Sequence, residues 1–299
     1  MIDLQNREGL DFLSDIEDNT VDLVLVDPPY IISKDSGMDK WVDHVAAQES
    51  PGATAARTEE QWEKYKHKRD LDTLVSDSEG KYKLETFKKN YLKYGSIYGK
   101  KYAVTTDYGA WDSEFTMEQL KDFVNEFYRV LKPGGTCIIF FDLWKITNLK
   151  DALDDAKFKQ FRFIEWVKSN PIPINQHVNY LSNAREIALS AVKKGKPTFN
   201  SKYDKGIYMY PVQNGKGKIH KNQKSLPLFE ELIRKHSNEG DLVLDCFAGS
   251  ATTAIACINT DRNFTGCELN KEYYEKASER VYGYQQARAH SSAVRAAGS

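Results

Sequence analysis

The 299-residue sequence lacks long apolar runs, has few cysteines and carries almost no net charge. No stretch reaches the roughly 18 consecutive apolar residues that a membrane-spanning helix needs, which excludes a helical membrane protein. The first residues form neither a basic start nor an apolar core, so we expect no secretory signal and a cytoplasmic protein. The four cysteines have no metal-ligand spacing and lie in apolar or small-residue runs: Cys137, Cys246, Cys257 and Cys267. We expect buried reduced thiols, with neither a disulfide scaffold nor a metal site.

The chain has two lysine-rich stretches, although acidic residues elsewhere bring its formal net charge to −1. Residues 81–102 contain seven lysines, five tyrosines and one glutamate, and residues 192–224 contain nine lysines and one aspartate. Lysines neutralise phosphates, and tyrosines can stack on sugars or extruded bases. Both stretches therefore predict contact with a nucleic acid, although a solvated face or a disordered loop can have the same composition.

Short apolar runs alternate with segments of helical periodicity along most of the chain. Nearly continuous apolar runs suit parallel strands covered on both faces, so we predict an α/β fold with a doubly wound, mostly parallel sheet. The predicted strands are 21–26, 136–141, 161–167, 186–192, 241–245 and 263–268. The predicted helices are 59–69, 117–131, 226–236, 250–258 and 271–284. Residues 33–115 interrupt the alternation and are interpreted as a long insertion, and the small polar residues 287–299 as a disordered tail.

The segment Asp27-Pro28-Pro29-Tyr30 directly follows the predicted strand 21–26, at the end where open α/β sheets bind their ligands. An exocyclic amino group on a base is a poor nucleophile, because its lone pair is delocalised into the ring. The Asp27 carboxylate and the Pro28 carbonyl can each accept one of its N–H hydrogen bonds, which localises the lone pair on nitrogen. The prolines keep these acceptors rigid, and Tyr30 offers a flat face for stacking. A proline-terminated strand without a ligand is the alternative interpretation.

A second loop, residues 245–253, follows the predicted strand 241–245 and opens a helix. Its small residues let backbone N–H groups approach an anionic group such as a carboxylate. It lacks the GxGxxG pattern of dinucleotide-binding loops, which disfavours a dehydrogenase. Glu268 ends the predicted strand 263–268, where a carboxylate can accept hydrogen bonds from the two hydroxyls of a ribose.

Two further segments, 166–173 (WVKSNPIP) and 220–226 (HKNQKSL), complete a set of motifs that occur in one order along the chain. Together the motifs resemble the β class of amino-group DNA methyltransferases, in which the Asp-Pro-Pro-Tyr segment comes first and the methyl-donor loop last. The resemblance covers residues 2–31, 116–192 and 220–284. It implies a Rossmann-like methyltransferase fold in circular order.

The resemblance implies an enzyme that uses S-adenosyl-L-methionine to methylate N6 of a flipped adenine in DNA. The catalytic residues that it implies are Asp27, Pro28, Pro29 and Tyr30. The cofactor-binding residues that it implies are Glu8, Asp27, Asn222, Gln223, Lys224, Asp245, Phe247, Ala248, Gly249, Ser250, Ala251, Thr252 and Glu268. The lysines that we expect to contact DNA are Lys88, Lys89, Lys93, Lys100, Lys101, Lys168, Lys202, Lys205, Lys216 and Lys218. Double-stranded DNA and a second copy of the chain are the expected partners, and a single-stranded substrate is left open.

The same resemblance divides the chain into functional parts. Residues 1–32 and 116–194 are expected to form the catalytic half of the methyltransferase domain, and residues 220–286 the half that binds the methyl donor. Residues 195–219 are expected to recognise the target sequence. The insertion 33–115 has no counterpart in the family pattern and is expected to face the DNA as well.

Four residues depart from the family pattern: Glu8 (usually Asp), Lys221 and Cys246 (each usually Pro) and Ala251 (usually Gly). The change at Ala251 leaves open a catalytically silent DNA-binding homologue. Cytosine N4 is the alternative target, although Asp27 favours adenine because the cytosine enzymes more often have Ser there. A protein-glutamine methyltransferase uses a similar segment, but its donor loop precedes that segment. The recognition sequence does not follow from these residues, since base readout depends on docking geometry.

Overall fold

The computed structural model describes residues 1–29, 57–66, 84–94, 115–171, 182–213 and 223–297. The chain divides into two compact units, one formed by residues 1–31 with 111–299 and the other by residues 32–110. Within the described ranges, no helix is both long and apolar enough to cross a membrane.

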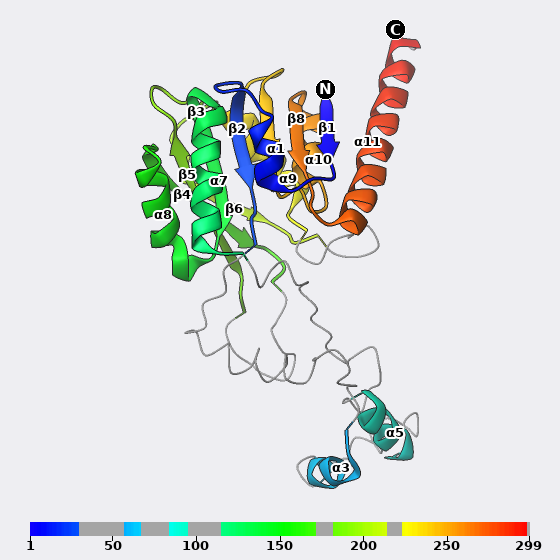
Figure 1. The fold of residues 1–299 in the computed structure, drawn as a ribbon. Coiled ribbons are helices and arrows are strands. Elements are labelled where there is room, and N and C mark those ends of the chain that lie inside the picture. Colours follow the sequence, from blue (N-terminus) through cyan, green and yellow to red (C-terminus); the bar gives the residue numbers. More distant parts are fainter. Residues whose placement is uncertain (30–56, 67–83, 95–114, 172–181, 214–222, 298–299) are drawn as a thin grey trace. The chain divides into compact units, whose positions relative to one another are not determined.

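An eight-stranded sheet forms the centre of the first unit (Figure 1). Its strands are β1 (Ile2–Gln5), β2 (Val21–Val26), β3 (Leu131–Phe141), β4 (Lys159–Lys168), β5 (Arg185–Val192), β6 (Ile207–Tyr210), β7 (Leu242–Asp245) and β8 (Asn263–Cys267). They lie in the order β1-β8-β7-β2-β3-β5-β4-β6. Only β5 is antiparallel to its neighbours, so its amino end shares one edge of the sheet with the carboxyl ends of the other strands. The predicted fold class is confirmed.

Helices cover both faces of this sheet (Figure 1). One face is covered by α1 (Gly9–Ser14), α7 (Met117–Val130) and α8 (Ile146–Asp155), and the other by α9 (Leu226–His236), α10 (Thr252–Thr260) and α11 (Lys271–Ala297). In β2, Val24 and Val26 belong to the core on the first face, whereas Leu23 and Leu25 belong to the core on the second. Because successive side chains of a strand point to opposite faces, burial of both faces accounts for the uninterrupted apolar run of β2.

Helix α7 begins at a capping box formed by Thr116 and Gln119. The Thr116 hydroxyl accepts from the backbone N–H of Gln119 at 3.2 Å, and the Gln119 side chain accepts from the backbone N–H of Thr116 at 2.8 Å. These two bonds satisfy N–H groups that a helix start leaves without partners. The helix then buries Leu120, Phe123 and Phe127 on one face, as the spacing predicts.

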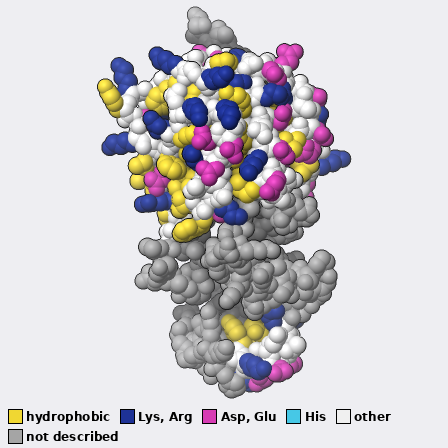
Figure 2. All heavy atoms as spheres, turned by 60° about the vertical axis from the view of Figure 1, so that its left-hand side comes forward, with side chains coloured by type: hydrophobic (Ala, Val, Ile, Leu, Met, Phe, Trp, Pro, Cys, Tyr) yellow, Lys and Arg dark blue, Asp and Glu magenta, His cyan; other side chains and the backbone are white. Residues whose placement is uncertain are grey.

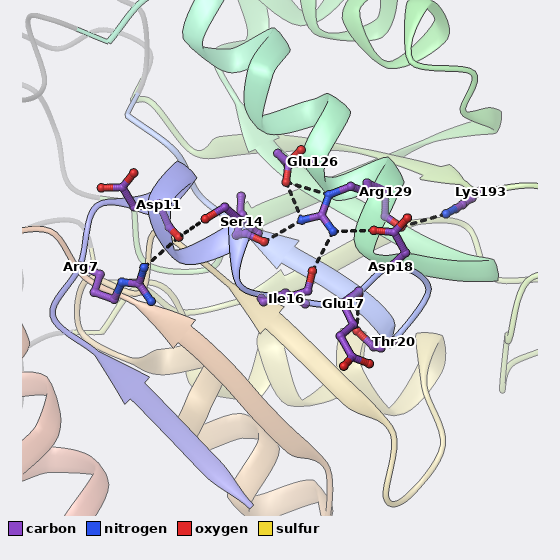
Figure 3. A network of polar contacts seen from close by, with 11 residues as sticks. Arg7, Asp11, Ser14, Ile16, Glu17, Asp18, Thr20, Glu126, Arg129 and Lys193 are labelled. Atoms are coloured by element: carbon purple, nitrogen blue, oxygen red, sulfur yellow. Dashed lines mark hydrogen bonds and ion pairs between the residues drawn. The ribbon is translucent and has the colours of Figure 1, made fainter.

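Arg129, near the end of α7, ties this helix to the turn that leads into β2 (Figure 3). Its guanidinium donates to the backbone carbonyls of Leu13 and Ile16, both at 2.7 Å. It also forms ion pairs with Glu126 at 2.6 Å and Asp18 at 2.7 Å. A planar guanidinium can satisfy several fixed acceptors at once. Arg129 therefore fixes the entry into β2, the strand that leads to Asp27.

The second unit contains two described helices, α3 (Glu59–Lys66) and α5 (Leu84–Tyr94). They share a small core of Trp62, Phe87 and Tyr91, with the rings of Trp62 and Tyr91 5.5 Å apart. Lys88 forms an ion pair with Glu59 at 2.8 Å. This unit, residues 32–110, covers nearly the same residues as the predicted insertion 33–115. Its expected contact with DNA stays a prediction.

The structure adds elements that the sequence analysis did not predict: β1, β6, α1, α5 and α8. It also corrects the prediction of a disordered tail at 287–299, because α11 continues to Ala297. That stretch contains five alanines and two arginines, and both residue types have high helix propensity. In addition, Arg288 forms an ion pair with Asp261.

Candidate active site

The predicted catalytic and donor-binding segments meet at the carboxyl edge of neighbouring strands. Asp27 follows β2, Asp245 ends β7 and Glu268 follows β8, and these three strands are adjacent in the sheet. The pairing of Val24 with Leu244 sets the register between β2 and β7. Residues that are more than two hundred positions apart in the sequence therefore lie at one site.

Hydrogen bonds from the donor loop fix Asp245 and Glu268 in place. The Asp245 carboxylate accepts from the backbone N–H of Phe247 at 3.0 Å and from the Thr253 hydroxyl at 2.5 Å. The Glu268 carboxylate accepts from the backbone N–H of Gly249 at 2.8 Å and of Asn270 at 2.8 Å. Glu268 thus supports the loop as well as offering further lone pairs to a ligand.

Ala251 lies in the left-handed region of backbone conformation, with φ of 55°, and its side chain is buried. Glycine adopts this conformation without the steric cost that a Cβ brings. The position therefore suits the glycine of the family pattern, and alanine is the smallest side chain that can replace it. The departure noted in the sequence leaves the turn intact.

The charges of the donor loop suit a cationic ligand. The pKa of Asp245 is raised from 3.8 to about 7, mainly by burial and in addition by the nearby Asp27 and Glu268 carboxylates, while its hydrogen bonds oppose the rise. Burial also raises the pKa of Glu268. Desolvated carboxylates that repel one another are stabilised by a positive charge between them.

Asp27 contacts a network of charges that the sequence analysis only partly identified. The Lys224 ammonium lies 2.8 Å from Asp27 Oδ2 and 2.6 Å from Glu186 Oε2, and Lys168 lies 2.8 Å from Glu186 Oε1. Burial alone would raise the pKa of Glu186, but the two lysines lower it to about 2. Glu186 was not predicted as a site residue. Its signal in the sequence is an acidic residue at the start of an otherwise apolar strand.

The remaining predicted cofactor residues have varied surroundings. Glu8 caps α1 by accepting from the backbone N–H of Asp11 at 2.9 Å. The Phe247 ring packs 4.7 Å from the Phe123 ring, between centroids. The remaining predicted residues within the described ranges are partly or fully buried: the catalytic Pro28 and Pro29 and the cofactor-binding Gln223, Ala248, Gly249, Ser250 and Thr252. Tyr30 and Asn222 lie outside the described residues.

The lysines predicted to contact DNA divide into three groups. Lys89, Lys93, Lys202 and Lys205 are exposed, and Lys88 is half-buried. Lys168 is mostly covered and forms the ion pair with Glu186, so the structure gives its ammonium another partner. Lys100, Lys101, Lys216 and Lys218 lie outside the described residues. The expected contacts to DNA stay predictions. The four cysteines are buried and free, as expected.

Comparison with known proteins connects this geometry to a family. A family profile for N6 and N4 methyltransferases, described as DNA methylase, matches residues 21–279. The chain is 33% identical over 198 residues to the type II methyltransferase M2.DpnII of Streptococcus pneumoniae, covering 60% of this chain and 73% of that protein. It is 25% identical over 292 residues to the type II methyltransferase M2.MboI of Moraxella bovis, covering 91% of this chain and 85% of that protein.

Solved structures show the same fold. The complex of M1.HpyAVI with SAM superposes with a TM-score of 0.58 at 24% identity, covering 94% of this chain and 99% of that one. The PvuII DNA methyltransferase, described as cytosine-N4-specific, superposes with a TM-score of 0.59 at 14% identity, covering 95% of this chain and 90% of that one.

Proposed function

The chain belongs to the DNA methylase family of N6 and N4 methyltransferases, and from this premise we propose that it methylates N6 of adenine at a specific DNA sequence. The observation that carries the proposal is the position of Asp27, which leaves β2 directly beside the acidic donor loop of β7. The alternative target, cytosine N4, requires the same two acceptors. Asp27 in the first position of the motif favours adenine.

In this proposal the chain's own residues activate the amino group. The Asp27 carboxylate and the Pro28 carbonyl accept its two N–H hydrogen bonds, which localises the lone pair on nitrogen. Both acceptors are held by the end of β2 and by two prolines, so little reorganisation accompanies the reaction. Tyr30 is proposed to stack on the base once it has left the duplex.

The residues of the donor loop fit S-adenosylmethionine. This cofactor supplies a methyl group already activated by a sulfonium charge. The buried carboxylate of Asp245 and the partly buried carboxylate of Glu268 suit its positive charge, and Glu268 can also accept from the ribose hydroxyls. Gly249 has φ of 52°, and the nearest atom that a Cβ there would meet is 3.9 Å away, so the backbone is open to a ligand.

The decisive test is methylation of a random-sequence DNA library with labelled donor, followed by nucleoside analysis and sequencing of the modified positions. N6-methyladenine within one short sequence is the expected product. N4-methylcytosine would overturn the choice of base. Donor binding without any transfer to single- or double-stranded DNA would identify a silent homologue instead.

The affinity for DNA is expected to fall steeply with added salt, because lysines displace condensed counterions from phosphates. On the face of the first unit shown in Figure 2, basic and acidic side chains are interspersed. We therefore attribute the salt response to the lysine-rich stretches 81–102 and 192–224. Titrating labelled duplex at increasing salt gives the slope directly. A flat response would remove this assignment.

Donor affinity is expected to weaken as the pH falls below 7. A positively charged donor favours ionised Asp245, whose pKa in the free protein is raised to about 7, so binding releases a proton. The loss of affinity approaches about tenfold for each pH unit below that pKa. Calorimetry in buffers of different ionisation enthalpy measures the proton directly. Asp245→Asn should bind the donor weakly but without this pH dependence, and an identical dependence in that variant would contradict the assignment.

Asp245 also makes the stability of the folded protein depend on pH. Its folded-state pKa lies above the ordinary 3.8, so the folded protein retains a proton that the unfolded chain has released between about pH 4 and 7. Asp245 therefore reduces the stability of the donor-free protein as the pH rises through that window, and bound donor should offset the loss.

A further inference from the structure

Four charged side chains of alternating sign form one chain of contacts at the catalytic edge. Lys168 ends β4, Glu186 lies at the start of β5, Lys224 precedes α9 and Asp27 follows β2. The successive N···O distances are 2.8, 2.6 and 2.8 Å. Their side chains are between 9% and 22% exposed. Weak screening by water makes the balance of these charges matter for the chemistry beside them.

Aromatic rings hold both lysines in this chain. The Lys224 ammonium lies 5.4 Å from the centroid of the Phe140 ring, and the Lys168 ammonium 5.5 Å from that of Trp166. Cation–π contacts favour these positions even when one carboxylate is neutralised. Within this chain of four contacts, loss of the Glu186 charge would therefore leave two ammonium groups and one carboxylate, Asp27.

Such an imbalance would oppose methyl transfer. In the reaction the amino nitrogen uses its lone pair to form the N–C bond, and the S–C bond breaks with its electron pair on sulfur. The nitrogen gains positive charge until one of its protons leaves to solvent. A net positive charge beside Asp27 repels this developing charge, and Lys224 would also draw Asp27 away from its role as acceptor.

We propose that Glu186 is a positioning residue for methyl transfer: it balances Lys168 and shares Lys224, so that Asp27 keeps its acceptor strength toward the reacting amino group. The inference rests on the proposed function. It assigns a role to the antiparallel strand β5, whose amino end places a carboxylate where the other strands end.

The test compares single-turnover rates of methyl transfer at saturating DNA and donor. Glu186→Gln removes the charge while keeping the shape, and should lower the rate roughly 10- to 100-fold with nearly unchanged affinity for donor and DNA. Glu186→Asp should retain most of the rate. The matched control is Glu165→Gln, which neutralises a carboxylate on β4 that is 3.2 Å from Arg185. We expect it to leave the rate unchanged.

A double variant separates charge balance from packing. Glu186→Gln combined with Lys168→Gln restores neutrality, and should transfer methyl groups several-fold faster than Glu186→Gln alone. A double variant no faster than the single one would overturn the proposal, as would a Glu186→Gln rate equal to that of Glu165→Gln. Absence of transfer by the wild-type protein, by contrast, would refute the proposed function itself.

Discussion

Asp27→Ala is expected to lower the rate of methyl transfer by about a thousandfold or more, while S-adenosylmethionine still binds. The variant removes one of the two proposed acceptors for the amino group and one of the two carboxylates that pair with Lys224. The lone pair then stays delocalised in the base. Single-turnover transfer of labelled methyl groups measures the rate, and calorimetry measures donor binding.

Two further variants make this result interpretable. Asp27→Asn keeps the shape of the side chain but offers one carbonyl oxygen in place of a carboxylate, and should also be strongly impaired. Asp151→Ala removes a carboxylate with a long ion-pair distance of 3.6 Å on the exposed side of α8 and should behave as wild type. Full activity of Asp27→Ala would refute the assigned chemistry.

Glu268→Ala should weaken donor binding by about a hundredfold, equivalent to the loss of two charge-assisted hydrogen bonds. The carboxylate holds the backbone N–H groups of Gly249 and Asn270, so its removal loosens the donor loop and deletes the proposed ribose acceptor. Calorimetric titration without DNA isolates this effect. Glu268→Gln, which keeps one acceptor, should be intermediate.

The control for Glu268 is Glu279→Gln on the exposed side of α11. It changes the same charge on an element that follows the donor loop, and should leave the affinity unchanged. Equal donor affinity for Glu268→Ala and the wild-type protein would contradict the role given to this carboxylate.

The sequence predicted the central sheet well because burial leaves a strong local pattern. The apolar run of β2 and the helical spacing of apolar residues in α7 are both readable from consecutive residues. Strand β1 alternates apolar and polar residues over only four positions, so no apolar run marks it. Strand β6 lies within a lysine-rich stretch and is stabilised by pairing with β4, a partner that composition does not reveal.

Of the site residues, only those that belong to a recognisable sequence motif could be predicted. Asp27 and Asp245 each belong to a recognisable segment at a strand end. Glu186 does not, because its importance comes from Lys168 and Lys224, which join it only through the fold. For the same reason Lys168 was interpreted as a DNA contact: a charge in the sequence does not show which partner covers it.

The pairing of β1 with β8 has a consequence for biosynthesis. The first strand pairs with a strand about 260 residues later, so that Ile2 lies opposite Phe264. While the chain is being translated, β1 has to remain unpaired until β8 has left the ribosome. Such distant contacts form slowly, so this edge of the sheet, beside the donor loop, should be the last part of the sheet to close.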